Sequence, residues 1–149
     1  MGNKCSIMIQ AATALTSSVL QAEAKALQLA ATLAQFLNLG RVTLLTDNQS
    51  LAKVATSRRF DHPLLRWDTR DTMASFFAVT SRSSIEVYHI KRDLNGVAHD
   101  CAHQALRRSL DQPIYSCVCS AHSLGSCPVI SVLQCVNLQG IVIQAVLCN

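Results

Sequence analysis

Two carboxylates, Glu23 and Asp47, occupy places in the sequence where acidic side chains can do chemistry. Glu23 lies within Ser17–Leu37, on the stripe of Ala and Leu residues that recurs every three or four positions and predicts the buried face of a helix. Asp47 directly follows the predicted strand Arg41–Thr46. Ligand sites in α/β sheets gather at the carboxyl ends of strands, and carboxylate oxygens suit Mg²⁺. The two residues therefore indicate a divalent-cation site.

Each carboxylate also has a purely structural interpretation. Asp47 could serve only as the N-cap of the helix that follows it, a role for which Asn48 is equally suited. Glu23 could lie at the edge of the apolar stripe with its charged end in water. Spacing alone leaves both alternatives open.

The elements that must position these residues alternate along the chain. Gly40 should end the first helix near the C′ position, and Arg41–Thr46, aliphatic on both faces, should be an inner strand. We predict strands at Lys4–Ala12, Arg41–Thr46 and Ser84–Ile90, and helices at Ser18–Asn38, from Asp47 or Asn48 onward, within His62–Ser81, and at Asn95–Leu110. This order predicts an α/β layered domain.

The distribution of charge divides the chain in two. The formal net charge is +4, and eleven of the thirteen Lys and Arg residues lie between Arg41 and Arg108. From Asp111 to Asn149 there is no Lys or Arg, and five of the seven cysteines are found there. We therefore expect a charged domain at residues 4–109 and an apolar, Cys-rich C-terminal tail at residues 110–149. No apolar run reaches the roughly 18 residues that a membrane span requires.

The cysteines favour reduced thiols over a disulfide framework, because their number is odd and no signal peptide precedes them. We accordingly expect an intracellular protein, in the nucleus or the cytoplasm. The segment Cys117–Cys127 contains three cysteines and His122, and this spacing departs from that of a zinc knuckle. Buried thiols are the favoured interpretation and a zinc site the alternative.

The N-terminal residues MGNKCS match a lipidation pattern, with Gly2 for myristate and Cys5 for palmitate. Two such lipids together could anchor a protein to a membrane. The alternative is a packed strand that begins almost at the first residue, and we favour it.

Three blocks of sequence resemble one family. They are LQAEAKALQLA, VTLLTDNQSLA and IEVYHIKRDLNGVAHDCAHQAL, in that order. Together they resemble the ribonuclease H-like domain of plant retroelement-derived proteins, the type 1 ribonuclease H domain attached to reverse transcriptases. The resemblance covers roughly Lys4 to Arg108 and implies a mixed sheet flanked by helices. It also implies that the first strand or strands of the family domain, with the first family acid, are missing from this chain.

The resemblance implies nucleic acid as the partner, and hydrolysis of the RNA strand of RNA–DNA hybrids with Mg²⁺ or Mn²⁺ held by four carboxylates. Glu23 and Asp47 match two of these and would be metal ligands. His99 stands where the family has an acid in its last helix, and as a third catalytic candidate it favours softer ions than Mg²⁺. With two matching ligands, activity should be weak or lost.

Nucleic-acid contacts are expected near this site from Asn48, Arg92 and Asn95. The segment Ser57–Trp67 mixes arginines with one Trp, as a nucleic-acid groove does, but a solvated loop with a core Trp fits equally well. The leading hypothesis is a ribonuclease H-like nucleic-acid-binding domain. The alternatives are a lipid-anchored interaction protein and a retroelement fragment without function.

Overall fold

The computed structural model describes residues 6–10, 16–107, 114–118 and 144–148. The chain forms two compact units. One unit is Ala14–Gly96, and the other combines Met1–Thr13 with Val97–Asn149. Residues 1–5 of the MGNKCS pattern and residues 119–127 of the cysteine segment lie outside the described residues, so lipidation and zinc binding stay predictions.

The first long helix, α1, spans Val19–Phe36 and confirms the prediction from the Ala and Leu stripe. Ser18 is its N-cap, because the Ser18 side chain accepts a hydrogen bond of 3.1 Å from the backbone N–H of Gln21. The buried face of α1 includes Ala24 and Leu27, next to Glu23. The predicted apolar face therefore does contact the core.

The end of α1 differs from the prediction. The left-handed residue beyond the C-cap is Asn38, with φ of 51°, and not Gly40. Asn tolerates this conformation better than other residues with a side chain, so it takes the place that glycine usually fills. Gly40 directly precedes β2.

Two parallel strands, β2 (Arg41–Thr46) and β3 (Ser84–His89), form the sheet of this unit. They pair in register from Arg41 opposite Ser84 to Thr46 opposite His89. The expectation that Arg41–Thr46 is buried on both faces is wrong, because its residues alternate and Leu45 is 55% exposed. Among the described residues β3 is the strand that pairs with β2.

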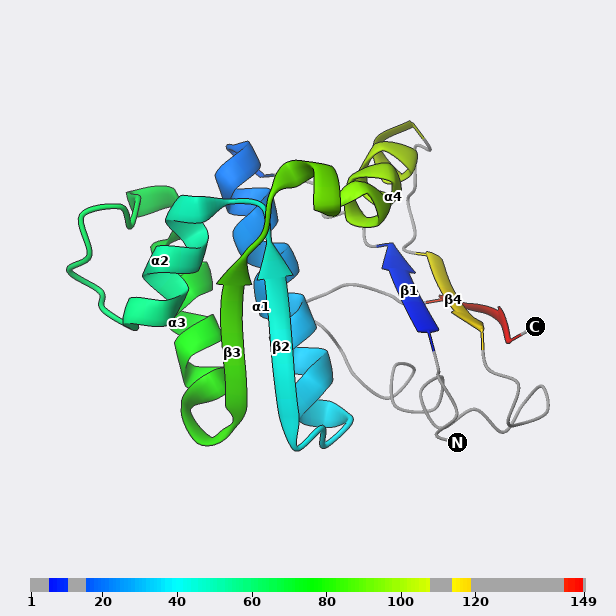
Figure 1. The fold of residues 1–149 in the computed structure, drawn as a ribbon, viewed down its shortest axis with the longest axis horizontal. Helices are drawn as coiled ribbons and strands as arrows, with labels where there is room; N and C mark the ends of the chain where they lie inside the picture. The colour runs from blue at the N-terminus through cyan, green and yellow to red at the C-terminus, as the bar shows by residue number, and fades with distance from the viewer. Residues whose placement is uncertain (1–5, 11–15, 108–113, 119–143, 149) are drawn as a thin grey trace. The chain divides into compact units, whose positions relative to one another are not determined.

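Helices cover this sheet and connect its strands. After β2 come α2 (Gln49–Ser57), the 3₁₀ helix η1 (Trp67–Thr69), α3 (Arg70–Val79) and the 3₁₀ helix η2 (Thr80–Arg82). Figure 1 shows α1 behind the sheet, with α2 and α3 beside β3. The core contains Ala24, Leu27, Ala31, Leu44, Leu51, Val54, Ala55, Leu65, Met73, Phe76 and Phe77. The predicted fold class is an α/β structure with a mixed sheet flanked by helices. Its α/β class and the flanking helices are confirmed, and the sheet of this unit consists of two parallel strands.

Trp67 is not a core residue. Its side chain is 79% exposed, whereas Phe76 and Met73 fill the interior. The interpretation of Ser57–Trp67 as a solvated segment with a core Trp is therefore wrong in its second part. Trp67 opens η1, and the buried residues of η1 are the polar Asp68 and Thr69. These polar side chains have hydrogen-bond partners, so they can replace the indole at the interior face.

The other unit contains a three-stranded sheet and the helix α4 (Gly96–Arg107). In the sheet, β1 (Ser6–Gln10) pairs antiparallel with β4 (Ile114–Val118), and β4 pairs parallel with β5 (Gln144–Cys148). The predicted first strand and last helix are both present. None of the helices in the described part of the chain is long and apolar enough to cross a membrane.

Candidate cation and nucleic-acid site

Glu23 lies in α1, directly before Ala24, which is fully buried. The residue itself is half-buried, and its Oε2 atom is buried without a hydrogen-bond partner among the described residues. The interpretation of Glu23 as a side chain bent out into water therefore does not describe this oxygen. A buried oxygen without a partner costs free energy, so it needs a ligand or a proton.

Asp47 follows the last residue of β2, and the next residue takes the capping role. The Asn48 side-chain oxygen accepts a hydrogen bond of 3.0 Å from the backbone N–H of Leu51, which makes Asn48 the N-cap of α2. The Asn48 backbone N–H in turn donates to Oγ1 of Thr46 at 3.1 Å. The structural interpretation of Asp47 as the N-cap is therefore wrong, and its carboxylate is available for another role.

Three of the predicted residues, Asp47, Asn48 and Arg92, act on the carboxyl group of a fourth, Glu23. Burial raises the pKa of the Glu23 carboxyl, and the charge of Asp47 raises it further. The side-chain amide of Asn48 and the charge of Arg92 lower this pKa and offset part of the effect. The net shift is upward. Two carboxylates thus act on each other at the carboxyl end of β2, with too little positive charge nearby to compensate.

This donor set fits one hard divalent cation. Mg²⁺ is commonly held by one or two carboxylates while it keeps several waters and contacts substrate phosphates. Glu23 offers a buried oxygen without a partner, and Asp47 offers a half-buried carboxylate. The described residues contain no group of three or more His, Cys, Asp or Glu side chains that could hold an ion. Glu23 and Asp47 are therefore two candidate ligands for a cation, fewer than the four carboxylates that the resemblance implies.

The residues after β3 lie close to this strand end. The backbone N–H of Ile90 donates to the carbonyl of Thr46 at 2.9 Å, which continues the pairing beyond β3. The 3₁₀ helix η3 (Arg92–Leu94) follows, and the backbone N–H of Asn95 closes it by donating to the Arg92 carbonyl at 2.9 Å. Arg92 acts on Glu23 electrostatically, whereas the contact predicted for Asn95 stays a prediction.

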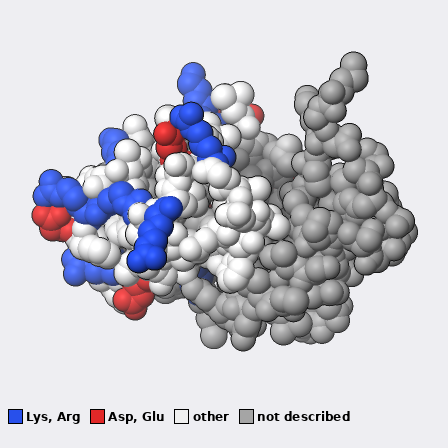
Figure 2. Space-filling view, turned by 90° about the horizontal axis from the view of Figure 1, so that it is seen from below, with Lys and Arg blue, Asp and Glu red and all other residues white. Residues whose placement is uncertain are grey.

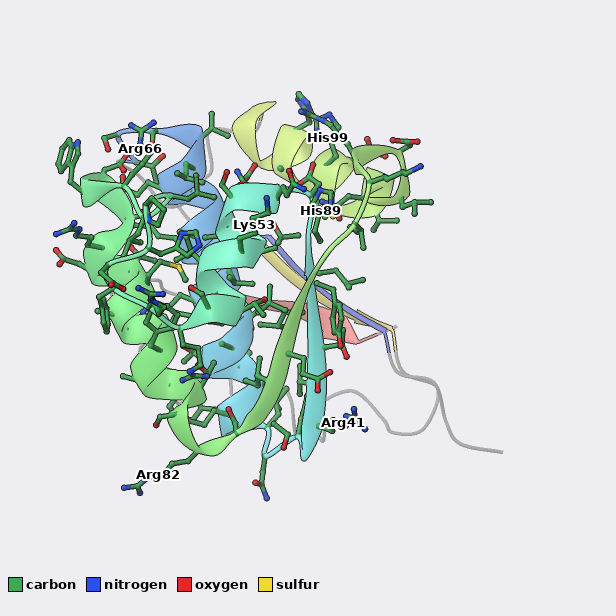
Figure 3. All side chains as sticks on the ribbon, turned by 60° about the vertical axis from the view of Figure 1, so that its left-hand side comes forward. Arg41, Lys53, Arg66, Arg82, His89 and His99 are labelled. Carbon is green, nitrogen blue, oxygen red and sulfur yellow. The ribbon has the colours of Figure 1, made fainter. Side chains whose placement is uncertain are left out.

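A groove of about 520 Å³ lies between α2 and β3. It is lined by Gln49, Ala52, Lys53, Thr56, Ser57, His62, Val87, Tyr88 and His89. Figure 3 labels Lys53 on α2 and His89 at the end of β3, on the two sides of this groove. Sequence reasoning did not select this groove, because its residues come from segments far apart along the chain.

His99 belongs to the other compact unit, where it lies on α4 (Figure 3). Its predicted place beside Glu23 and Asp47 therefore stays a prediction. His99 forms a side-chain hydrogen bond with His103, with the two Nε2 atoms 3.0 Å apart. Sequence reasoning missed His103, although four-residue spacing of histidines on a predicted helix was a signal that could have found it.

A family model described as reverse transcriptase-like matches residues 2–105. The chain belongs to this reverse transcriptase-like family. The match confirms the resemblance to a ribonuclease H-like domain and covers most of the chain, including Glu23, Asp47 and His99. Comparison with curated proteins and with solved structures found no significant match. At the level of its family, the chain is thus a ribonuclease H-like, nucleic-acid-related domain.

Proposed function

We propose that this reverse transcriptase-like domain binds RNA–DNA hybrids at the carboxyl end of β2, where Glu23 and Asp47 hold one divalent cation. The observation that carries the proposal is the buried Oε2 atom of Glu23, which has no hydrogen-bond partner among the described residues. The hydrogen bond with the Asn48 side chain acts on the Glu23 carboxyl group, whereas the buried Oε2 atom has no partner of its own, as a structural carboxylate oxygen would be expected to have. An oxygen left free beside a second carboxylate is suited to a cation.

The cation, when bound, would offset the repulsion between the two carboxylates and attract a phosphate oxygen of the nucleic acid. Asp47 is free for this role because Asn48 performs the capping. Asn48 holds the first turn of α2 and lowers the pKa of Glu23, so it favours the ionised form that a cation needs. Glu23 and Asp47 are thus the metal residues of the proposal, with Mg²⁺ or Mn²⁺ as the ion.

Nucleic acid would be held mainly through its backbone. Figure 2 shows the described surface from below Figure 1, at the end opposite the carboxyl end of β2, with Lys and Arg side chains and acidic side chains among them. At the carboxyl end of β2 the exposed Lys91 and Arg92 follow β3. Such basic side chains attract phosphates without reading bases, so binding should show little sequence preference and should weaken as salt rises. Arg92 is the basic residue that acts on Glu23, and Lys53 and His89 both line the groove between α2 and β3.

Hydrolysis by this chain should be slow. Two-ion cleavage of phosphodiesters depends on a clamp that stabilises both the attacking and the leaving oxygen. Glu23 and Asp47 would supply two carboxylates, and His99 stands where the resemblance implies an acid, so an imidazole would replace a carboxylate there. We infer that binding of hybrid persists while turnover is weak.

The test is binding of a fluorescent RNA–DNA hybrid to the full chain, measured by anisotropy over a series of salt concentrations, with and without Mg²⁺. Arg92→Gln should weaken binding. Arg82→Gln is the matched control, because Arg82 precedes β3 at its opposite end (Figure 3). An equal loss of affinity for the hybrid in both variants would show that binding is not centred at the carboxyl end of β2. Absence of binding at low salt would exclude the nucleic-acid function itself.

A further inference from the structure

Two imidazole rings on α4 lie in an edge-to-face contact. The Nε2 atoms of His99 and His103 lie 3.0 Å apart, and the ring planes are nearly perpendicular at 81° with centroids 4.3 Å apart. Residues four apart lie on the same face of an α-helix, so the backbone itself supports this approach. His103 is exposed and His99 is half-buried, so an ion in solution can reach the space between the rings.

This arrangement has two chemical uses. One ring can donate its Nε2–H to the lone pair of the other, which gives an isolated hydrogen bond. Alternatively, both lone pairs can bind one metal ion. Two nitrogens, each about 2.1 Å from an ion and at right angles around it, lie about 3.0 Å apart. A tetrahedral ion needs a separation of about 3.4 Å, which small side-chain rotations can supply. The observed spacing therefore accommodates a shared ion without a change in the helix.

The ligand atoms decide the class of ion. Imidazole nitrogens favour Zn²⁺, Ni²⁺ and Cu²⁺, whereas Mg²⁺ favours oxygen. The same four-residue spacing of two histidines on a helix holds zinc in H-E-x-x-H sites. In α4 the intervening residues are Asp100, Cys101 and Ala102, and one or two steps along a helix turn a side chain by about 100° or 200° from His99. Asp100 and Cys101 are therefore not placed to face the pair directly.

We propose that His99 and His103 chelate one transition-metal ion of the Zn²⁺ or Ni²⁺ type, with water completing its coordination. The site is distinct from the carboxylates Glu23 and Asp47 in both its ligand atoms and its preferred ion. It uses two protein ligands, in agreement with the finding that the described residues hold no larger group of metal-binding side chains.

The test is calorimetric titration of the full chain with Ni²⁺ and with Zn²⁺. His99→Ala and His103→Ala should each reduce the association constant about tenfold or more, because one of two metal–nitrogen bonds is lost. His62→Ala is the matched control and should leave this binding unchanged. Far-UV circular dichroism of each variant checks that α4 remains helical. Binding that is equal in all four proteins would overturn the proposal, since it would place the ion on other residues such as thiols.

A sharper variant exchanges two neighbours, His103→Gln with Gln104→His. This exchange keeps the composition and moves the second imidazole to the next helical position, where it no longer faces His99. We expect the association constant for the metal ion to fall as much as in His103→Ala. An unchanged association constant would overturn the proposed chelate. Glu23→Gln should bind Ni²⁺ normally. Loss of Ni²⁺ binding in Glu23→Gln would show that the histidine pair alone does not form the site.

Discussion

The Ser18 hydroxyl donates a hydrogen bond of 2.7 Å to Oδ2 of Asp68, a residue fifty positions further along the chain. The same hydroxyl accepts from the backbone N–H of Gln21 as the N-cap of α1, and the Gln21 side chain donates to the Asp68 carbonyl at 2.9 Å. Arg66 forms an ion pair of 3.3 Å with the Asp68 carboxylate, whose side chain is 2% exposed. The start of α1 is thus tied to η1 by one buried acid.

The first prediction concerns this acid. The hydrogen bond from Ser18 holds the pKa of Asp68 below its ordinary value of 3.8, and the charge of Arg66 lowers it further. A lowered pKa means that the ionised carboxylate stabilises the folded state at neutral pH, and that this contribution is lost as pH falls below 3.8. Asp68→Asn should therefore melt at a lower temperature than the parent at pH 7, with a smaller difference at acidic pH.

Thermal melts from pH 3 to pH 7 make this measurement. Asp71→Asn is the control, since Asp71 is an exposed acid close by in the first turn of α3. If Asp68→Asn lowered the melting temperature by the same amount at every pH, the electrostatic explanation would be contradicted. Ser18→Ala removes both the cap and the bond to Asp68, so it should cost about 1 to 2 kcal/mol of unfolding free energy.

The second prediction concerns Glu23, whose pKa is raised above 4.5 by burial and by Asp47. A raised pKa affects folding stability in the opposite way to a lowered one. Folding favours the protonated Glu23 carboxyl, so its contribution to the free energy of unfolding is lost as pH rises from 4.5 through the folded-state pKa. Glu23→Gln should leave stability at pH 7 unchanged or raise it by up to about 0.5 kcal/mol, a small gain because solvent screens a half-exposed group. Millimolar Mg²⁺ should stabilise the parent more than the variant.

Chemical denaturation of both proteins with and without Mg²⁺ checks the second prediction. Glu86→Gln is the control, because Glu86 is an exposed acid on β3. If Glu23→Gln lowers stability markedly and Mg²⁺ affects neither protein, Glu23 is a structural residue and the cation site is wrong.

The third prediction concerns cleavage. If Glu23 and Asp47 are the two carboxylates that match the family's metal ligands, the purified chain should hydrolyse an RNA–DNA hybrid barely detectably in Mg²⁺. Mn²⁺ should support somewhat more, since it tolerates a nitrogen ligand such as His99 better. Gel analysis of a labelled hybrid is the measurement, with Asp47→Asn as the comparison. Rapid Mg²⁺-dependent turnover that Asp47→Asn abolishes would show that the site is complete.

The fourth prediction concerns Arg58, which ends α2 in a left-handed conformation with φ of 53°. Its guanidinium donates to the carbonyl of Phe77 at 2.9 Å and lies 5.7 Å from the centre of the Phe77 ring. Arg58→Ala should cost about 2 to 3 kcal/mol, because it loses the charge-assisted hydrogen bonds to the carbonyls of Phe77 and Thr80, while the backbone strain of the left-handed region stays as in the parent. Arg58→Gly should be less destabilised than Arg58→Ala by about 1 kcal/mol. Urea denaturation compares the three proteins, and an Ala variant as stable as the Gly variant would contradict the backbone argument.

The elements of this fold could be predicted because local patterns specify them. The spacing of Ala and Leu defines α1, and the aliphatic run before Asp47 defines β2 with the same bounds that the structure gives. Burial was harder to predict. Trp67 is exposed and Leu45 is 55% exposed, because contacts from distant segments decide which side chains the core accepts.

The site could be predicted only where one residue type identifies a role. Glu23 and Asp47 were selected from their places on a helix and at a strand end, and the structure couples them electrostatically. Which of Asp47 and Asn48 caps α2 could not be decided, because both side chains can cap and only the hydrogen bond to Leu51 distinguishes them. Burial of one carboxylate oxygen depends on packing that no sequence pattern reports.

The register of β2 and β3 has a consequence for the order of folding. Residues that face each other across these strands, such as Arg41 and Ser84, are separated by more than forty positions. During synthesis, β2 leaves the ribosome before its partner strand exists, and α2, η1 and α3 must all follow first. Long-range parallel pairing is slow because a large loop must close before any pairing free energy is gained. The carboxylates Glu23 and Asp47 should therefore reach their final environment late, after β3 has joined the sheet.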